Sequence, residues 1–185
     1  ELKCQAGIMV TASHNPAKYN GYKVYGSDGA QILPDTADKI AAFMDEIDMF
    51  SVEKMPFEQA LEAHLVTLLD ERTDFSFIAH TLALSIRRDA IPASDLALVY
   101  TPFHGAGAFF VPEVLKSAGL KNLICVDAQM TPDGDFPTVT SPNPETDESF
   151  ELALQLAKEK CADIIIGTDP DADRVGVMCR NRAGE

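Results

Sequence analysis

The sequence has 185 residues, of which 46% are hydrophobic and 24% are charged, a balance typical of a globular protein rather than a disordered one. Its net charge is −14, because 29 acidic residues outnumber 15 basic ones. This charge argues against a nucleic-acid partner, since binding a polyanion depends on clustered lysines and arginines. There is no apolar run of roughly 18 residues that would span a membrane and no signal segment, so we expect no membrane association. A small phosphorylated substrate is still allowed.

The first 50 residues predict two strands, a hairpin and a helix. The letters AGIMVTA indicate a buried strand through Ile8, Met9 and Val10, and GYKVYGSDGAQI indicates a second strand with a turn at residues 27–29. Residues 35–50 predict a helix opened by Pro34. Its apolar positions follow the i, i+3, i+4, i+7 spacing of an amphipathic helix: Ile40, Phe43, Met44 and Ile47.

The remaining residues alternate between helix and strand patterns. Helices are expected at 60–72, 76–88, 109–118 (ended by Gly119) and 147–161, and strands at 95–101, 122–128, 162–168 and 175–180. Strands separated by helices imply crossover connections. We therefore predict an α/β fold with mixed, partly parallel sheets flanked by helices. A connection at residues 51–60 places a domain boundary between segments 1–55 and 56–185.

The four cysteines lack the spacing of a metal site. They are Cys4, Cys125, Cys161 and Cys179. Two of them, Cys125 and Cys179, lie in apolar runs, so we expect reduced thiols in the core of a cytosolic protein.

The loop after the first predicted strand, TASHNP, carries Ser13 and His14. Its Asn and Pro residues are turn formers, so Ser13 can be simply a turn residue. A hydroxyl on a tight loop can also be a nucleophile. A hydrolase triad is poorly supported, because this serine is not part of a G-x-S-x-G motif and adjacent Ser and His residues need not contact each other.

A second loop, GTDPDADRVGV, follows an apolar run and contains Asp169, Asp171 and Asp173 at two-residue spacing. In extended chain this spacing directs all three carboxylates to one side, where their repulsion calls for a compensating cation. Hard oxygen ligands favour Mg²⁺, Mn²⁺ or Ca²⁺. An EF-hand is excluded, because Arg174 and Arg180 occupy the positions that require Gly and Glu. A solvated acidic turn is the alternative interpretation.

Together the two loops suggest phosphoryl transfer. A phosphate on Ser13 can fill a free coordination position of a metal held by the carboxylates, and Lys23, Lys18 and Arg174 can supply positive charge or proton transfer. In these motifs the chain resembles the α-D-phosphohexomutase superfamily, and within it the phosphoglucomutase and phosphopentomutase branch. The resemblance rests on TASHNP, on GTDPDADRVGV, on YNGYKVY with its lysine, and on TPFHGAG and FPTVTSPNPE.

The resemblance implies a role for each matching residue. Ser13 would be the phosphorylated serine, and Asp169, Asp171 and Asp173 would hold Mg²⁺ together with an oxygen of that phosphate. Lys23 and His14 would assist proton transfer or steady the phosphoryl group, and Arg174 would add positive charge. The implied reaction interconverts sugar 1-phosphates and 6-phosphates through a bisphosphorylated intermediate, and glucose is the sugar that we expect. A phosphopentomutase or phosphomannomutase of the same superfamily is the alternative.

The family fold has four domains, and the resemblance places residues 1–55 at the end of the first and residues 56–185 in the second. We therefore expect a fragment whose remaining domains carry the sugar-recognition and phosphate-binding loops, and which is inactive in isolation. A non-catalytic α/β module that only binds a cation or a partner is the second hypothesis. Within TPFHGAG, His104 is either a residue that shapes the site or one that only stabilises a turn.

Overall fold

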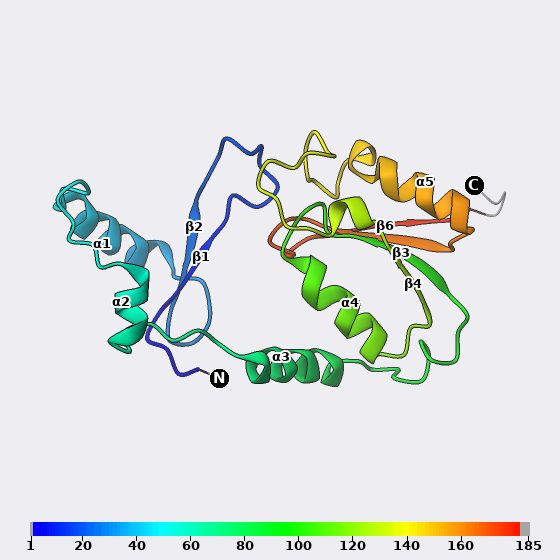
Figure 1. The fold of residues 1–185 in the computed structure, drawn as a ribbon, viewed down its shortest axis with the longest axis horizontal. Helices are drawn as coiled ribbons and strands as arrows, with labels where there is room; N and C mark the ends of the chain where they lie inside the picture. The colour runs from blue at the N-terminus through cyan, green and yellow to red at the C-terminus, as the bar shows by residue number, and fades with distance from the viewer. Residues whose placement is uncertain (1, 182–185) are drawn as a thin grey trace. The chain divides into compact units, whose positions relative to one another are not determined.

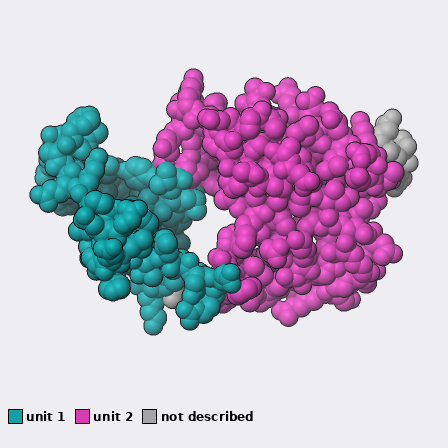
Figure 2. Space-filling view, viewed as in Figure 1, with its two compact units in different colours: residues 1–10, 22–73 teal, residues 11–21, 74–185 magenta. Residues whose placement is uncertain are grey.

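The computed structural model describes residues 2–181, which form two compact units. The first contains residues 1–10 and 22–73, and the second contains residues 11–21 and 74–185. Figure 2 colours them separately. The loop at residues 11–21 interrupts the first unit in sequence but belongs to the second. These units are groupings by spatial contact, and the domain boundary expected near residue 55 remains a prediction.

The predicted hairpin of the first unit is present. Strand β1 (Gly7–Val10) pairs antiparallel with β2 (Tyr22–Tyr25), and β2 turns back through Gly29, whose φ of +80° suits a residue without a side chain. The expected burial of β1 is wrong, because Ile8 and Val10 are 71% and 72% exposed. Within the described residues β2 is the only strand paired with β1, so no strand lies along the other edge of β1.

Helix α1 (Pro34–Asp45) begins at the predicted proline but ends before the predicted residue 50. Asp48 competes with the helix there, because its side chain accepts a hydrogen bond from the Phe50 N–H at 3.0 Å. The apolar stripe of this helix is largely exposed, and Phe43 is 69% accessible.

The helix expected at 60–72 is replaced by the short α2 (Phe57–Glu62) and a break. His64 takes a left-handed φ of +55°, which no helix continues. Helix α3 (Glu71–Ala83) starts and ends earlier than the predicted 76–88. Its start is fixed by Asp70, whose side chain accepts a hydrogen bond from the Arg72 N–H at 3.1 Å.

The second unit contains the predicted mixed sheet. Its strands are β3 (Ala97–Thr101), β4 (Asn122–Cys125), β5 (Ile164–Thr168) and β6 (Val175–Cys179) in the order β4-β3-β5-β6. The first three are parallel, and β6 runs antiparallel to β5. Single-turn 3₁₀ helices lie at Asp127–Gln129 and Asp147–Phe150. No helix in residues 2–181 combines the length and the apolar character needed to cross a membrane.

Two helices cover opposite faces of this sheet (Figure 1). Alternate residues of β3 point to opposite sides, so Val99 packs with Ile165 and Phe150 on the side of α5 (Glu151–Lys160). Leu98 and Tyr100 pack on the other side, against α4 (Gly107–Ser117). The predicted stop of α4 is confirmed, since Gly119 has a φ of +95°.

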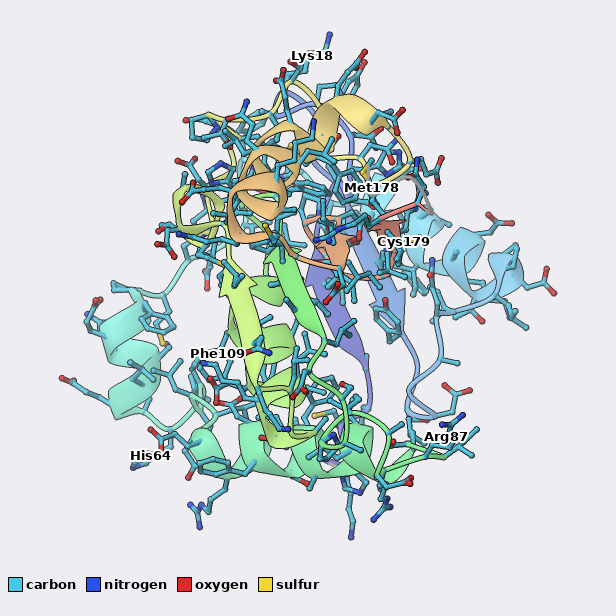
Figure 3. All side chains as sticks on the ribbon, turned by 90° about the vertical axis from the view of Figure 1, so that its right-hand side faces the viewer. Lys18, His64, Arg87, Phe109, Met178 and Cys179 are labelled. Carbon is cyan, nitrogen blue, oxygen red and sulfur yellow. The ribbon has the colours of Figure 1, made fainter. Side chains whose placement is uncertain are left out.

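The structure corrects the expectation for Cys179. All four cysteines are free, and Cys125 is half-buried, but Cys179 is exposed at the end of β6 (Figure 3). Strand β6 lies at an edge of the described sheet and alternates, with Gly176 and Met178 turned inward and Val175, Val177 and Cys179 turned outward.

Gly167 of β5 is expected to tolerate no side chain. A Cβ there would lie 2.6 Å from Phe150 Cε1 and 2.7 Å from Phe103 Cζ, in the centre of the core. Gly167→Ala should lower the free energy of unfolding by about 1–3 kcal/mol, as overpacking a core does. Chemical denaturation measures this loss, with Gly134→Ala as the control, because a Cβ at Gly134 has no neighbour within 4 Å. Equal stability of the two variants would contradict the tight packing described here.

Candidate active site

The serine loop, residues 11–21, is closed at its base by a hydrogen bond of 2.9 Å from the Thr11 N–H to the Gly21 carbonyl. The Thr11 hydroxyl then accepts the Ser13 N–H at 2.8 Å, which forms a tight turn of the kind that Ser and Thr favour. Ser13 has a left-handed φ of +52°, an uncommon conformation for a residue with a side chain. The chain thus holds this serine in an unusual backbone conformation on a short loop.

The serine loop meets the acidic loop, residues 169–174. The Ser13 hydroxyl donates to Asp169 Oδ2 at 2.9 Å, and the Thr11 hydroxyl donates to Asp171 Oδ2 at 3.2 Å. Both contacts join residues more than 150 positions apart in sequence. Thr11 was not singled out from the sequence, although a Thr two residues before a loop Ser is a recognisable turn pattern.

The three predicted metal ligands lie together. Carboxylate oxygens of Asp169, Asp171 and Asp173 all fall within 4.8 Å of one another. They converge through a tight turn rather than through extended chain, since Ala172 has a φ of +57° and donates its N–H to the Asp169 carbonyl at 2.9 Å. Asp169 is fully buried and Asp173 is exposed, so the group opens toward solvent on one side.

Asp169 has a perturbed acidity. Burial raises the pKa of its carboxyl above the ordinary 3.8, and the charges of Asp171 and Asp173 raise it further. Hydrogen bonds from the Arg174 N–H, at 3.0 Å, and from Ser13 act in the opposite direction. The three carboxylates carry like charge and one of them is desolvated. A bound cation would reduce the repulsion among them.

His14 and Arg174 extend the group on the serine side. The Arg174 guanidinium lies 3.4 Å from His14 Nε2, and His14 Nδ1 lies 3.3 Å from Ser13 Oγ. Arginine only donates, so Nε2 accepts and a neutral imidazole carries its proton on Nδ1. The hydrogen bonds therefore run in one direction, from Arg174 through His14 and Ser13 to Asp169.

Glu145 also binds Arg174, with 3.3 Å between NH1 and Oε1. Both side chains are substantially exposed, so this pair contributes little to stability and serves mainly to orient the guanidinium. Glu145 was not predicted from the sequence. It ends the run FPTVTSPNPE, one of the motifs that carry the family resemblance, but no role was expected for it.

The two predicted lysines lie on different elements, Lys18 on the serine loop and Lys23 on β2. Lys18 is exposed, its ammonium lies 5.2 Å from the centroid of the Tyr19 ring, and its side chain extends outward (Figure 3). Lys23 lies on β2, opposite Met9 in the first unit. A role of Lys23 in catalysis remains a prediction.

A mixed α/β sheet with a serine, three carboxylates and an arginine gathered beyond β5 has the parts of a phosphoryl-transfer site. Comparisons with known proteins identify the family. Residues 75–184 match a model of phosphoglucomutase/phosphomannomutase, alpha/beta/alpha domain II, and residues 1–50 match domain I of the same family. The chain belongs to the phosphoglucomutase/phosphomannomutase family.

Individual relatives agree with this assignment. A phosphoglucomutase of Staphylococcus aureus (strain N315) is 40% identical over 184 residues, which cover 99% of this chain and 32% of the relative. A phosphoglucomutase of Staphylococcus epidermidis is 37% identical over 193 residues, which cover 99% of this chain and 33% of the relative. The chain thus spans about a third of the length of the curated relatives it matches.

Solved structures also share the fold. The crystal structure of a Thermus thermophilus protein described as a phosphomannomutase superposes with a TM-score of 0.73 at 27% identity, covering 96% of this chain and 37% of that protein. A phosphoglucomutase/phosphomannomutase family protein from Burkholderia thailandensis has a TM-score of 0.64 at 23% identity, covering 94% of this chain and 33% of that protein. The predicted fold class is confirmed.

Proposed function

We propose that this chain carries the phosphoserine loop and the metal loop of a phosphosugar mutase that interconverts sugar 1-phosphates and 6-phosphates, with glucose phosphate as substrate. The observation that carries the proposal is the 2.9 Å hydrogen bond from the Ser13 hydroxyl to Asp169. A serine used only for a turn has no need of a buried carboxylate from a distant loop. The names of the Staphylococcus relatives support glucose as the sugar.

The proposed step transfers a phosphoryl group from Ser13 to a sugar hydroxyl. The bond between Ser13 Oγ and phosphorus breaks as the sugar oxygen bonds to phosphorus, and the proton released by the sugar hydroxyl is finally taken up by Ser13 Oγ. His14 points its Nδ1–H at this oxygen and stabilises the negative charge that develops there. Arg174 keeps His14 in the required tautomer and adds positive charge. Lys23 is proposed to relay the proton or to steady the phosphoryl group.

Mg²⁺ is the cation that we propose for the acidic loop. Asp169, Asp171 and Asp173 offer only carboxylate oxygens, the donor type that Mg²⁺ prefers, and their spacing within 4.8 Å fits a single ion. A phosphate oxygen on Ser13 would complete the set, because Ser13 already reaches Asp169. When bound, the ion would neutralise the carboxylates and the phosphoryl group.

Cation binding is expected to depend on pH. Because burial raises the pKa of Asp169, this carboxyl holds its proton at a higher pH than an ordinary aspartate does, and a proton on it competes with the ion. The Mg²⁺ affinity of the 185-residue chain should therefore fall as the solution is acidified, and the fall should begin at a higher pH than it would for an aspartate with the ordinary pKa of 3.8. Calorimetric titration at several pH values measures this. An affinity that stays constant down to the pH at which an ordinary aspartate takes up its proton would contradict the role of Asp169.

The other proposals concern the setting of this site. The remaining domains of the parent protein are its proposed partners, since the relatives are about three times as long as the matched segment. A cytoplasmic location is proposed on the basis of four free thiols.

A coupled assay tests the function. The full-length protein that contains this chain should convert glucose 1-phosphate to glucose 6-phosphate with Mg²⁺ and catalytic glucose 1,6-bisphosphate. Faster conversion of mannose or pentose phosphates would indicate the phosphomannomutase or phosphopentomutase alternative instead. Failure to convert any of these sugar phosphates, with a correctly folded protein, would favour the non-catalytic module.

A further inference from the structure

His104 is a buried histidine for which the proposed reaction has no use. Only 4% of its surface is exposed, and both ring nitrogens are occupied. Nδ1 lies 3.1 Å from the Thr131 carbonyl, and Nε2 lies 2.9 Å from the Thr138 hydroxyl. A carbonyl only accepts, so Nδ1 carries the proton and Nε2 accepts from Thr138. The ring thus joins the turn after β3 to two positions of the segment 127–139.

The same segment is joined to β3 by Gln129, which is fully buried. Its amide nitrogen donates to the Thr138 hydroxyl at 2.9 Å, and its amide oxygen accepts from the Thr101 hydroxyl. Thr138 therefore accepts from Gln129 and donates to His104, so every member of this network has a defined direction. Such a network fixes one conformation, because a buried polar group left unpaired is costly.

The network holds an unfavourable turn in place. Phe103 and His104 both have left-handed backbones, with φ of +46° and +63°. Side-chain-bearing residues rarely adopt this conformation twice in succession, so the surroundings must impose it. The His104 N–H donates to the Gln129 carbonyl, and the His104 carbonyl accepts from the Asp133 N–H, each at 3.0 Å.

This turn is in close backbone contact with the acidic loop. A Cβ placed on Gly105 would lie 2.4 Å from the Pro170 Cα, so only glycine allows the two backbones to approach so closely. The next residue, Ala106, donates its N–H to the Pro170 carbonyl at 2.8 Å. Pro170 stands between two of the proposed metal ligands, Asp169 and Asp171. The position of those carboxylates therefore depends on the turn that His104 holds.

We propose that His104 is a positioning residue for the acidic loop: through Thr138, Thr131 and Gln129 it fixes the turn at 103–106, and this turn fixes Pro170 between two cation ligands. The inference rests on the proposed function insofar as the loop is a cation site. Its structural part, the control of the loop by His104, stands on the contacts alone.

Two variants of the 185-residue chain test this inference. His104→Ala removes both ring contacts, and Thr138→Val removes the hydroxyl that binds the ring while leaving the turn itself intact. Leu120→Ala is the control, because it weakens the core on the α4 side without touching the turn. Hydrogen exchange of the Ala106, Ala172 and Arg174 amides and the Mg²⁺ affinity are measured well below the unfolding temperature.

The amides of the turn and the acidic loop should exchange at least about tenfold faster in both network variants than in the control, and Mg²⁺ affinity should fall about 10–100-fold, as it does when supports of metal ligands are lost. If exchange in the network variants matches the control, the inference is wrong. If His104→Ala does not fold, Thr138→Val decides alone. If the unaltered chain binds no Mg²⁺, the proposed cation site fails, while the exchange rates still decide the role of His104.

Discussion

Ser13→Ala in the full-length protein is expected to lower mutase turnover by at least about a thousandfold, the scale seen when a nucleophile is removed from an enzyme. Alanine has no oxygen to carry a phosphoryl group, so the phosphorylated form of the protein cannot form at this position. The fold should survive, because Ser13 is half-buried on a loop and its N–H bond to Thr11 does not involve its side chain. The coupled glucose 6-phosphate assay measures the rate, and circular dichroism checks the fold.

Ser27→Ala is the matched control for this change. Ser27 lies in the exposed hairpin turn of the first unit, so the same loss of a hydroxyl there should leave turnover unchanged. Near-normal turnover of the Ser13→Ala protein would rule out Ser13 as the phosphoryl carrier.

Asp171→Asn is expected to lower the Mg²⁺ affinity of the chain at least about tenfold, with a corresponding loss of rate in the full-length protein. The change removes one of three negative charges that face one another within 4.8 Å and leaves an amide oxygen, which is a weaker ligand for a hard cation. In the absence of Mg²⁺ the variant should be at least as stable as the unaltered chain, because one repulsion is gone.

Thermal unfolding with and without Mg²⁺ shows both effects, since an ion that binds only the folded state raises the unfolding temperature. Glu159→Gln is the control, because it removes the same charge from the exposed end of α5, where Glu159 pairs with Lys160. An equal Mg²⁺-induced shift in the Asp171→Asn and Glu159→Gln chains would show that the acidic loop is not the cation site.

The sequence predicted those features that depend on local pattern and on connection rules. Alternating helices and strands implied a partly parallel sheet, and the four strands of the second unit lie where the apolar runs placed them. Gly119 stops α4 because glycine alone accepts its backbone angle without strain. The pairing of Ser13 with the acidic loop was expected from the chemistry of the two motifs together rather than from either alone.

Burial was predicted less well, because it depends on partners that a local pattern does not name. Ile8 and Phe43 have the spacing of buried faces but are exposed within the described residues. Cys179 has apolar neighbours in sequence, yet it is exposed because it occupies one of the alternate positions of β6 that point away from the core. The helix expected at 60–72 is interrupted at His64, which has a left-handed backbone conformation. Apolar periodicity does not predict such a backbone conformation.

The supporting residues of the site were the hardest to predict. Thr11 and Glu145 act through contacts with residues far along the chain. His104 could be interpreted either as a turn former or as part of the site, and its partners lie 27 and 34 positions away. Only the three-dimensional fold brings those partners together, so the choice between the two interpretations required the structure.

The most direct test of the central claim is to locate a labelled phosphoryl group on the full-length protein. After brief incubation with glucose 1,6-bisphosphate labelled with ¹⁸O in its phosphates, rapid quenching and peptide mapping by mass spectrometry should find the labelled phosphate on Ser13. A chase with unlabelled sugar phosphate should then remove the label at a rate that accounts for turnover. A label on another residue, or one that leaves Ser13 far more slowly than the enzyme turns over, would contradict the assignment of this loop as the phosphoryl carrier.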